Sequence, residues 1–139
     1  MLEIRPFKPE EEKEVIALWQ TCGLVVAHNN PARDIARKRA VNPEWFLVGL
    51  LDGRLAATCM AGYEGHRGWI NYLAVLPDCR RRGLATAMVR EAEQLLKEAG
   101  CPKINLQIRE TNETVIAFYS KIGYTRDPVI SMGRRLIPD

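Results

Sequence analysis

WINYLAVLPDCRRRGLATAMVREAEQLLKEAG, which spans residues 69–100, is the stretch around which the rest of the chain is organised. Its apolar first part, residues 69–76, predicts a strand that stops at Pro77, because proline cannot donate to a sheet ladder. Apolar residues then recur at three- and four-residue steps, which predicts a helix over residues 84–99 that Gly100 ends. The stretch therefore predicts a strand, a short basic loop and a helix.

The loop before this helix favours an anionic ligand. The first turn of a helix leaves about four backbone N–H groups unpaired and carries about half a positive charge, a combination that binds phosphate. Gly83 and Ala85 have little or no side chain, so a phosphate can approach the backbone, and Arg80, Arg81 and Arg82 add charge. A solvated basic turn between a strand and a helix is the alternative, because short loops with glycine are common.

The composition is that of an ordinary globular protein, with 47% apolar and 27% charged residues. A length of 139 residues predicts a single domain over residues 1–139. The net charge of +3 is too small to indicate a polyanionic partner. The first six residues lack the apolar core of a signal peptide, and Asp52 and Arg54 interrupt the most apolar region, which excludes a membrane span there. The four cysteines form no C-x-x-C pair, which favours a reduced, cytoplasmic chain; they are Cys22, Cys59, Cys79 and Cys101.

The remaining segments predict an α/β domain with a mixed, mostly antiparallel sheet of six or seven strands flanked by about four helices. Asp52-Gly53 joins two apolar runs and is a strong hairpin signal. Asn30-Pro31 is suited to the start of a helix that runs to about residue 40. Its basic residues are expected to form a solvated face, with steering of a substrate as the alternative; they are Arg33, Arg37, Lys38 and Arg39. The expected strands are residues 2–7, 45–51, 55–63, 69–76, 103–109 and 129–136. Further helices are expected from Pro9 to Cys22 and from a cap at Thr111 or Asn112 to Ile122.

Three motifs in one order resemble the GNAT superfamily of N-acetyltransferases. Arg80 to Ala85 matches the signature Arg/Gln-x-x-Gly-x-Gly/Ala, and residues 73–77 are similar to the strand that precedes it in the family. Downstream, Asn112 and residues 117–124 resemble the pattern Asn…Phe-Tyr-x-x-x-Gly-Phe/Tyr. The resemblance covers most of the chain. Two shorter stretches, residues 62–68 and 133–136, are also similar to a small bacterial subgroup typified by YpeA.

The resemblance implies that acetyl-CoA is the co-substrate and that its pyrophosphate lies on the backbone N–H groups at the start of the helix. Leu73 and Val75 would then offer main-chain hydrogen bonds to the pantetheine arm, and an N–H group near Val75 would polarise the thioester carbonyl. Asn112 would cap its helix, contact the cofactor, or do both. The cofactor-binding residues implied in this way are Leu73, Ala74, Val75, Arg80, Arg81, Arg82, Gly83, Leu84, Ala85, Thr86 and Asn112.

Tyr119 matches the tyrosine that protonates the departing CoA thiolate in the family. The reference pKa of tyrosine is about 10, so the phenol holds its proton at pH 7 and can donate it. On the pattern alone, an aromatic residue in the apolar stripe of a helix belongs to the core, and that alternative stays open.

A general base is harder to assign from the sequence. The two positions that carry a glutamate in some members of the family are Gln107 and Trp69 here, and neither side chain can act as a base. Glu64 and His66, in the turn before the central strand, are the nearest candidates. A purely solvated turn is the alternative for both residues, and a water chain or an already neutral amine would make a base unnecessary.

Other kinds of site find less support. His28 and His66 have no metal-ligand spacing with the cysteines, so no metal is expected. Cys79 stands beside three arginines, which could lower its thiol pKa, but it lacks a partner base and a structural role is expected. The arginine run lacks interleaved aromatic residues, so nucleic acid is not expected as a partner.

The sequence thus predicts an acetyl-CoA-dependent N-acetyltransferase that transfers acetyl directly to a primary amine in a ternary complex. A non-catalytic acyl-CoA-binding sensor or interaction domain with the same fold is the alternative. The acceptor is an amine on a small molecule or a protein, and the resemblance allows a homodimer.

Overall fold

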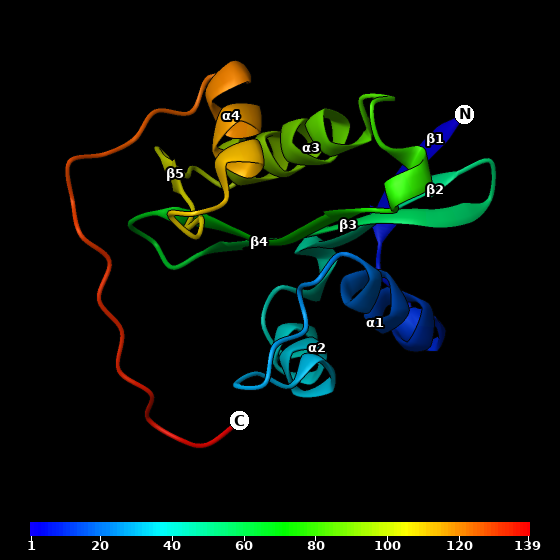
Figure 1. The fold of residues 1–139 in the computed structure, drawn as a ribbon, viewed down its shortest axis with the longest axis horizontal. Coiled ribbons are helices and arrows are strands. Elements are labelled where there is room, and N and C mark those ends of the chain that lie inside the picture. Colours follow the sequence, from blue (N-terminus) through cyan, green and yellow to red (C-terminus); the bar gives the residue numbers. More distant parts are fainter. The chain divides into compact units, whose positions relative to one another are not determined.

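The computed structural model describes all 139 residues, and the chain separates into two compact units. The first unit holds Met1–Asn105 together with Asp139, and the second holds Leu106–Pro138. A sheet in the order β1-β2-β3-β4-β5 forms the centre of the first unit (Figure 1). It has five strands, so the expectation of six or seven was wrong; the strands are β1 (Leu2–Pro6), β2 (Phe46–Leu51), β3 (Arg54–Tyr63), β4 (Gly68–Val75) and β5 (Ile104–Asn105).

Three helices of the first unit cover both faces of its sheet. Helices α1 (Glu12–Thr21) and α2 (Pro31–Arg39) lie on one face, and α3 (Leu84–Glu98) lies on the other (Figure 1). The second unit contributes α4 (Glu113–Lys121), which makes four α-helices as expected. The mixed sheet is also confirmed, because β4 pairs antiparallel with β3 and parallel with β5.

Two expected strands differ from the structure. The strand expected over residues 103–109 is reduced to Ile104–Asn105, and residues 129–136 form no strand. A polar–apolar alternation gives a segment two faces, but a strand also needs a neighbour that satisfies its backbone groups. Residues 129–136 pair with no strand, and Val129 and Ile130 are 77% and 84% exposed.

The core of the first unit fills both sides of the sheet. Seven consecutive residues of β3, Leu55 to Ala61, are buried, as expected for a strand covered on both faces. Trp19 of α1 and Ile35 of α2 are fully buried on one side. The apolar stripe of α3 supplies the other side with Met88, Val89, Ala92 and Leu96.

Local sequence signals correctly predict several ends of helices and strands. Asp52 and Gly53 have φ values of 50° and 83°, the two positive values that a tight two-residue hairpin turn needs. The side chain of Asn30 accepts a hydrogen bond from the backbone of Arg33 at 3.2 Å and caps α2. Gly100 follows Ala99, the C-cap of α3, with a φ of 90°, and its N–H donates to the carbonyl of Lys97.

A partly buried ion pair ties β1 to the turn that precedes α1. Both nitrogens at the end of Arg5 donate to the Glu11 carboxylate, at 3.0 and 2.7 Å, and the N–H of Lys8 donates to it at 2.8 Å. The bonds from Arg5, with a smaller contribution from the N–H of Lys8, hold the pKa of Glu11 below its ordinary value. The folded state therefore favours the ionised carboxylate.

We expect this pair to make stability depend on pH below neutrality. The contribution of Glu11 is fully present above its ordinary pKa of about 4.3 and is lost as pH falls through the depressed value. Glu11→Gln should therefore lower the free energy of unfolding by about 1–3 kcal/mol at pH 7, and the difference from wild type should shrink on acidification. Urea unfolding at several pH values measures this. Glu10→Gln, which changes an exposed neighbour, is the control, and a difference independent of pH would contradict the assignment.

Candidate functional site

The loop before α3 presents a row of backbone N–H groups. Gly83 is the N-cap of α3 with a φ of 78°, and Arg81 has a φ of 66°. Ala87 is the first residue of this region whose N–H donates within the protein, to the carbonyl of Gly83 at 3.0 Å. The N–H groups of residues 81–86 donate no hydrogen bond to any protein atom.

The chemistry of this loop suits a phosphate. The unpaired N–H groups lie at the positive end of a fifteen-residue helix. The side chains of Arg80, Arg81 and Arg82 are exposed, so they add positive charge without blocking the backbone. A Cβ at Gly83 would meet no atom within 4 Å, so the backbone there is open to an approaching group.

The strand before this loop has an unpaired edge. Strand β5 pairs only with Gly68 and Trp69, and no other strand lies on that side of β4. The N–H of Leu76 donates toward β3, to the carbonyl of Ala56 at 2.8 Å. Because backbone groups alternate along an antiparallel strand, the N–H of Val75 points to the opposite, unpaired edge. Leu73, Ala74 and Val75 therefore lie on the strand with this free edge, directly before the loop of residues 80–86.

A bulge in β4 lies just before these residues. Met60 pairs with Asn71 but Thr58 pairs with Ala74, so Tyr72 and Leu73 together lie opposite the single residue Cys59. Tyr72 has a φ of 51°, which is strained for an aromatic residue.

Buried hydrogen bonds hold the bulge in place. The Thr58 hydroxyl, which is fully buried, donates to the carbonyl of Tyr72 at 2.8 Å and accepts from Nε1 of Trp19 at 2.9 Å. The rings of Trp19 and Tyr72 are stacked with their centroids 3.8 Å apart. This network fixes where β4 departs from regular pairing.

In the second unit, the ends of α4 orient Tyr119. The side chain of Asn112 accepts from the N–H of Val115 at 3.3 Å, so its predicted capping role is confirmed. At the other end, the N–H of Gly123 donates to Ser120 and that of Tyr124 donates to Tyr119, which is a Schellman cap. The rings of Tyr119 and Tyr124 meet edge to face at 5.3 Å, so the Gly-Tyr end of the motif braces the Tyr119 ring, which is 6% exposed.

The proposed bases lie in the turn between β3 and β4. Oε1 of Glu64 accepts from the backbone N–H groups of His66, at 3.0 Å, and of Arg67. Nδ1 of His66 lies 3.5 Å from the Arg67 guanidinium, and both Glu64 and His66 are exposed. These bonds give Glu64 a structural role in the turn, whatever else it does. The loop, β4 and the two bases belong to the first unit, and Tyr119 and Asn112 to the second.

Other sequence expectations are settled by burial. Burial, and then a bond at 3.2 Å to Asp78, raise the pKa of the Cys79 thiol, so the arginines do not activate it. Lys38 does not belong to a solvated face, because its ammonium donates to the buried carbonyl of Ala61 and burial lowers its pKa. No group of three or more acidic, histidine or cysteine side chains could hold a metal ion. No helix has the length and apolar content that crossing a membrane requires.

Comparison with known proteins decides the family. The family model described as "Acetyltransferase (GNAT) family" matches residues 7–124, which include both units' motifs. The chain belongs to this family. An acetyltransferase of Yersinia pestis is 44% identical over 138 residues, covering 99% of this chain and 98% of the relative. The prediction of an enzyme of the N-acetyltransferase class is therefore confirmed.

Solved structures of other proteins share the fold. Ard1 from Thermoplasma volcanium superposes with a TM-score of 0.77 at 25% identity, covering 89% of this chain and 82% of that one. The PaiA N-acetyltransferase from Thermoplasma acidophilum, solved in complex with coenzyme A, gives a TM-score of 0.73 at 17% identity. The superposition covers 94% of this chain and 93% of that one.

Sequence reasoning missed one group of residues near β4. Asn29, Asp34 and Tyr72 form a polar chain in which Nδ2 of Asn29 donates to the Tyr72 hydroxyl at 2.9 Å and this hydroxyl donates to Asp34 at 2.6 Å. Tyr72 lies 43 positions after Asn29 and 38 after Asp34, and no motif links it to them. Only the packing of α2 against the sheet brings them together.

Proposed function

We propose that the protein transfers the acetyl group of acetyl-CoA to a primary amine by direct transfer in a ternary complex, as a single domain over residues 1–139. The observation that carries this proposal is the row of unpaired N–H groups at residues 81–86, next to the free edge of β4. The family model, which runs through both units, supports treating them as one functional domain. A non-catalytic sensor is not favoured, since the similar relatives are named acetyltransferases.

The residues of the chain suit the parts of acetyl-CoA. The N–H groups from Arg81 to Thr86 would hold the diphosphate, with the guanidinium groups of Arg80 to Arg82 nearby. The free edge at Leu73 to Val75 would bind the pantetheine arm as a strand would, and the N–H of Val75 would polarise the thioester carbonyl. Asn112 is a further contact in this proposal. No residue set suggests a metal requirement.

The transfer of acetyl from CoA to an amine also requires two proton transfers, which side chains carry out. Tyr119 donates its phenolic proton to the sulfur of the leaving CoA, so the thiol rather than the thiolate departs. Glu64 or His66 accepts the proton that the amine loses, directly or through water. A pH–rate profile that stays the same in Glu64→Ala and His66→Ala would exclude both residues as the base.

Calorimetry and a turnover assay test the proposal separately. CoA is expected to bind with a stoichiometry of one, and a thiol-release assay over a panel of small amines and amine-bearing peptides is expected to find turnover. No heat at high micromolar CoA would contradict the proposed site. Binding without turnover on any amine would contradict the reaction but leave the CoA site in place.

Gly83→Ala is expected to weaken CoA binding about tenfold or more. A Cβ at this position would project into space that no protein atom fills, close to the N–H groups that hold the phosphates. Losing one or two charge-assisted hydrogen bonds accounts for an effect of this size. The dissociation constant from calorimetry measures it.

Gly53→Ala is a matched control for this variant. Gly53 also has a positive φ, 83°, and open space at its Cβ, but it lies in the β2–β3 turn. Both substitutions should cost similar stability through backbone strain, and only Gly83→Ala should change the affinity for CoA. Equal affinities in the two variants would exclude the loop as the phosphate site.

We also propose that the chain belongs to the YpeA-like subgroup, that it acts in the cytoplasm and that it forms a homodimer. Residues 62–68 and 133–136 support the subgroup, and four unpaired cysteines suit a reducing compartment. Size-exclusion chromatography with light scattering tests the homodimer.

A further inference from the structure

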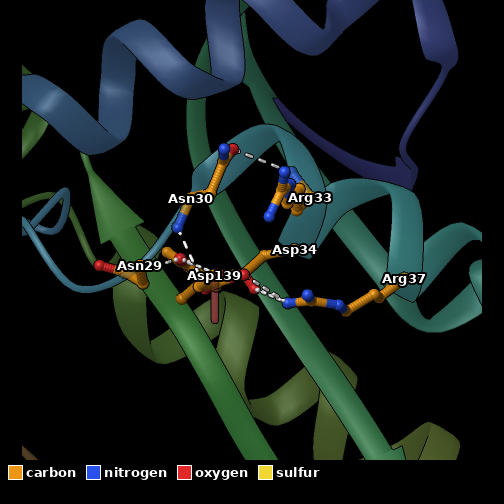
Figure 2. Close-up of polar contacts among 7 residues, drawn as sticks. Asn29, Asn30, Arg33, Asp34, Arg37 and Asp139 are labelled. Carbon is orange, nitrogen blue, oxygen red and sulfur yellow. Dashed lines mark hydrogen bonds and ion pairs between the residues drawn. The ribbon is translucent and has the colours of Figure 1, made fainter. Parts of the chain in front are cut away.

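A carboxylate is bound at the start of α2, and it comes from the far end of the sequence. Oδ1 of Asp139 lies 2.8 Å from Nη1 of Arg37, and the backbone N–H of Asn30 donates to Oδ2 at 3.2 Å. Figure 2 shows the Asp139 side chain between Asn30 at the beginning of the helix and Arg37 further along it. The side chain of Asp139 is 6% exposed, so this carboxylate is taken out of water by polar groups.

The receptor residues are held in place independently of Asp139. Nη1 of Arg37 also contacts Oδ1 of Asp34, at 3.3 Å, one helical turn away. The other oxygen of Asp34 accepts from the Tyr72 hydroxyl, which in turn accepts from Asn29. Asn30 is fixed by capping α2. The guanidinium and the N–H group therefore already face the position that the Asp139 carboxylate occupies.

The carboxylate of Asp139 makes polar contacts that join this residue to the first unit. It is the only residue after Asn105 that groups with the first unit, whereas Leu106–Pro138 form the second. The preceding residues Leu136 and Ile137 are 86% and 64% exposed, so they add little apolar burial. The contacts on the first unit thus recognise a carboxylate as such, which means that a carboxylate from another molecule can compete for them.

The location ties this group to the proposed reaction. Tyr72 belongs both to the polar chain around Arg37 and to the bulge of β4. Val75, whose N–H faces the free edge, is three residues further along β4, at most about 10 Å of extended chain. An acceptor that reaches from Val75 to Arg37 must also pass the Tyr72 side chain, whose hydroxyl bonds Asp34 beside Arg37. This requires a molecule longer than a single amino acid, such as a peptide.

We propose that Arg37 and the N–H of Asn30 form a carboxylate-binding site that Asp139 fills within the free protein and that a carboxylate on the acceptor fills during turnover. The acceptor is then an amine that also carries a carboxylate, such as a short acidic peptide. Asp139 acts as an internal competitor for this site. The acceptor half of the proposal rests on the proposed function, and the site itself does not.

A binding experiment tests the site without any turnover. The probe is N-acetyl-aspartic acid amide, whose only charge is a side-chain carboxylate, and N-acetyl-asparagine amide is the matched neutral probe. By NMR titration, Asp139→Asn is expected to bind the acidic probe at least fivefold more tightly than wild type does, and Arg37→Gln in that background should abolish the gain. A gain of affinity cannot result from misfolding. Equal binding of the acidic and neutral probes by Asp139→Asn would overturn the site.

A kinetic experiment tests the acceptor class. For carboxylate-bearing amines, Asp139→Asn should lower KM several-fold and Arg37→Gln should raise it about ten- to a hundredfold. When the carboxylate of each amine is replaced by a neutral amide, both variants should leave KM unchanged. Comparing each acid with its own amide removes the effect of differences in amine reactivity. Arg39→Gln, in the same turn of α2 and exposed, is the control. If KM shifts equally for the acids and their amides, the proposed acceptor class is wrong. If no amine turns over in any variant, the proposed function fails. The binding experiment then still decides whether the carboxylate site exists.

Discussion

Tyr119→Phe is expected to lower kcat by a factor of about 10² to 10⁴ and to leave the affinity for CoA unchanged. This is the usual contribution of a side chain that transfers a proton in the transition state. Phenylalanine keeps the ring and its edge-to-face contacts with Phe118 and Tyr124, which lie 5.0 and 5.3 Å away between centroids. The variant thus removes the acid while it preserves the packing of α4.

Single-turnover and steady-state assays, together with CoA calorimetry, separate the chemical step from binding. Tyr124→Phe is the matched control, because it removes a hydroxyl from the neighbouring ring of the same Schellman cap. Its kcat should stay within a few-fold of wild type. If Tyr119→Phe and Tyr124→Phe had the same kcat as wild type, Tyr119 would be a core residue, which is the alternative that its helical pattern also allows.

Features that depend on neighbouring residues could be predicted from the sequence. The Asp52-Gly53 turn, the Asn30 and Asn112 caps and the glycine beyond α3 follow from backbone preferences that a few adjacent residues determine. The loop of residues 80–85 is recognisable for the same reason, since its glycine and the helix start that follows are contiguous.

Features that depend on distant partners could not be predicted in this way. Residues 103–109 alternate like a strand, but only two of them find a place beside β4. The bulge at Tyr72 has no local signal, because aromatic residues seldom adopt a positive φ. It exists because Thr58 and Trp19, on another strand and on a helix, bond and stack with it. The contact of Asp139 with Arg37 joins residues 102 positions apart and is equally invisible to a periodic pattern.

The same bulge makes Thr58 the position where a nearly isosteric change should cost most stability. Thr58→Val keeps the shape of the side chain but removes the hydroxyl that serves Trp19 and Tyr72 at once. An indole N–H and a carbonyl would then be left without their partner in the core, at about 1–3 kcal/mol each. We expect the free energy of unfolding to fall by about 2–6 kcal/mol, a large part of the 5–15 kcal/mol typical of a domain.

Thr58→Ser separates the hydroxyl from the methyl group. Serine keeps both hydrogen bonds and loses only one buried methyl, so it should cost about 1 kcal/mol. Urea unfolding of the three proteins measures the difference. If Thr58→Val were as stable as Thr58→Ser, the hydroxyl would not hold the bulge. If Thr58→Val is destabilised as expected, its folded fraction should also have a lower kcat/KM, because the bulge directs the backbone of β4 that leads to Val75.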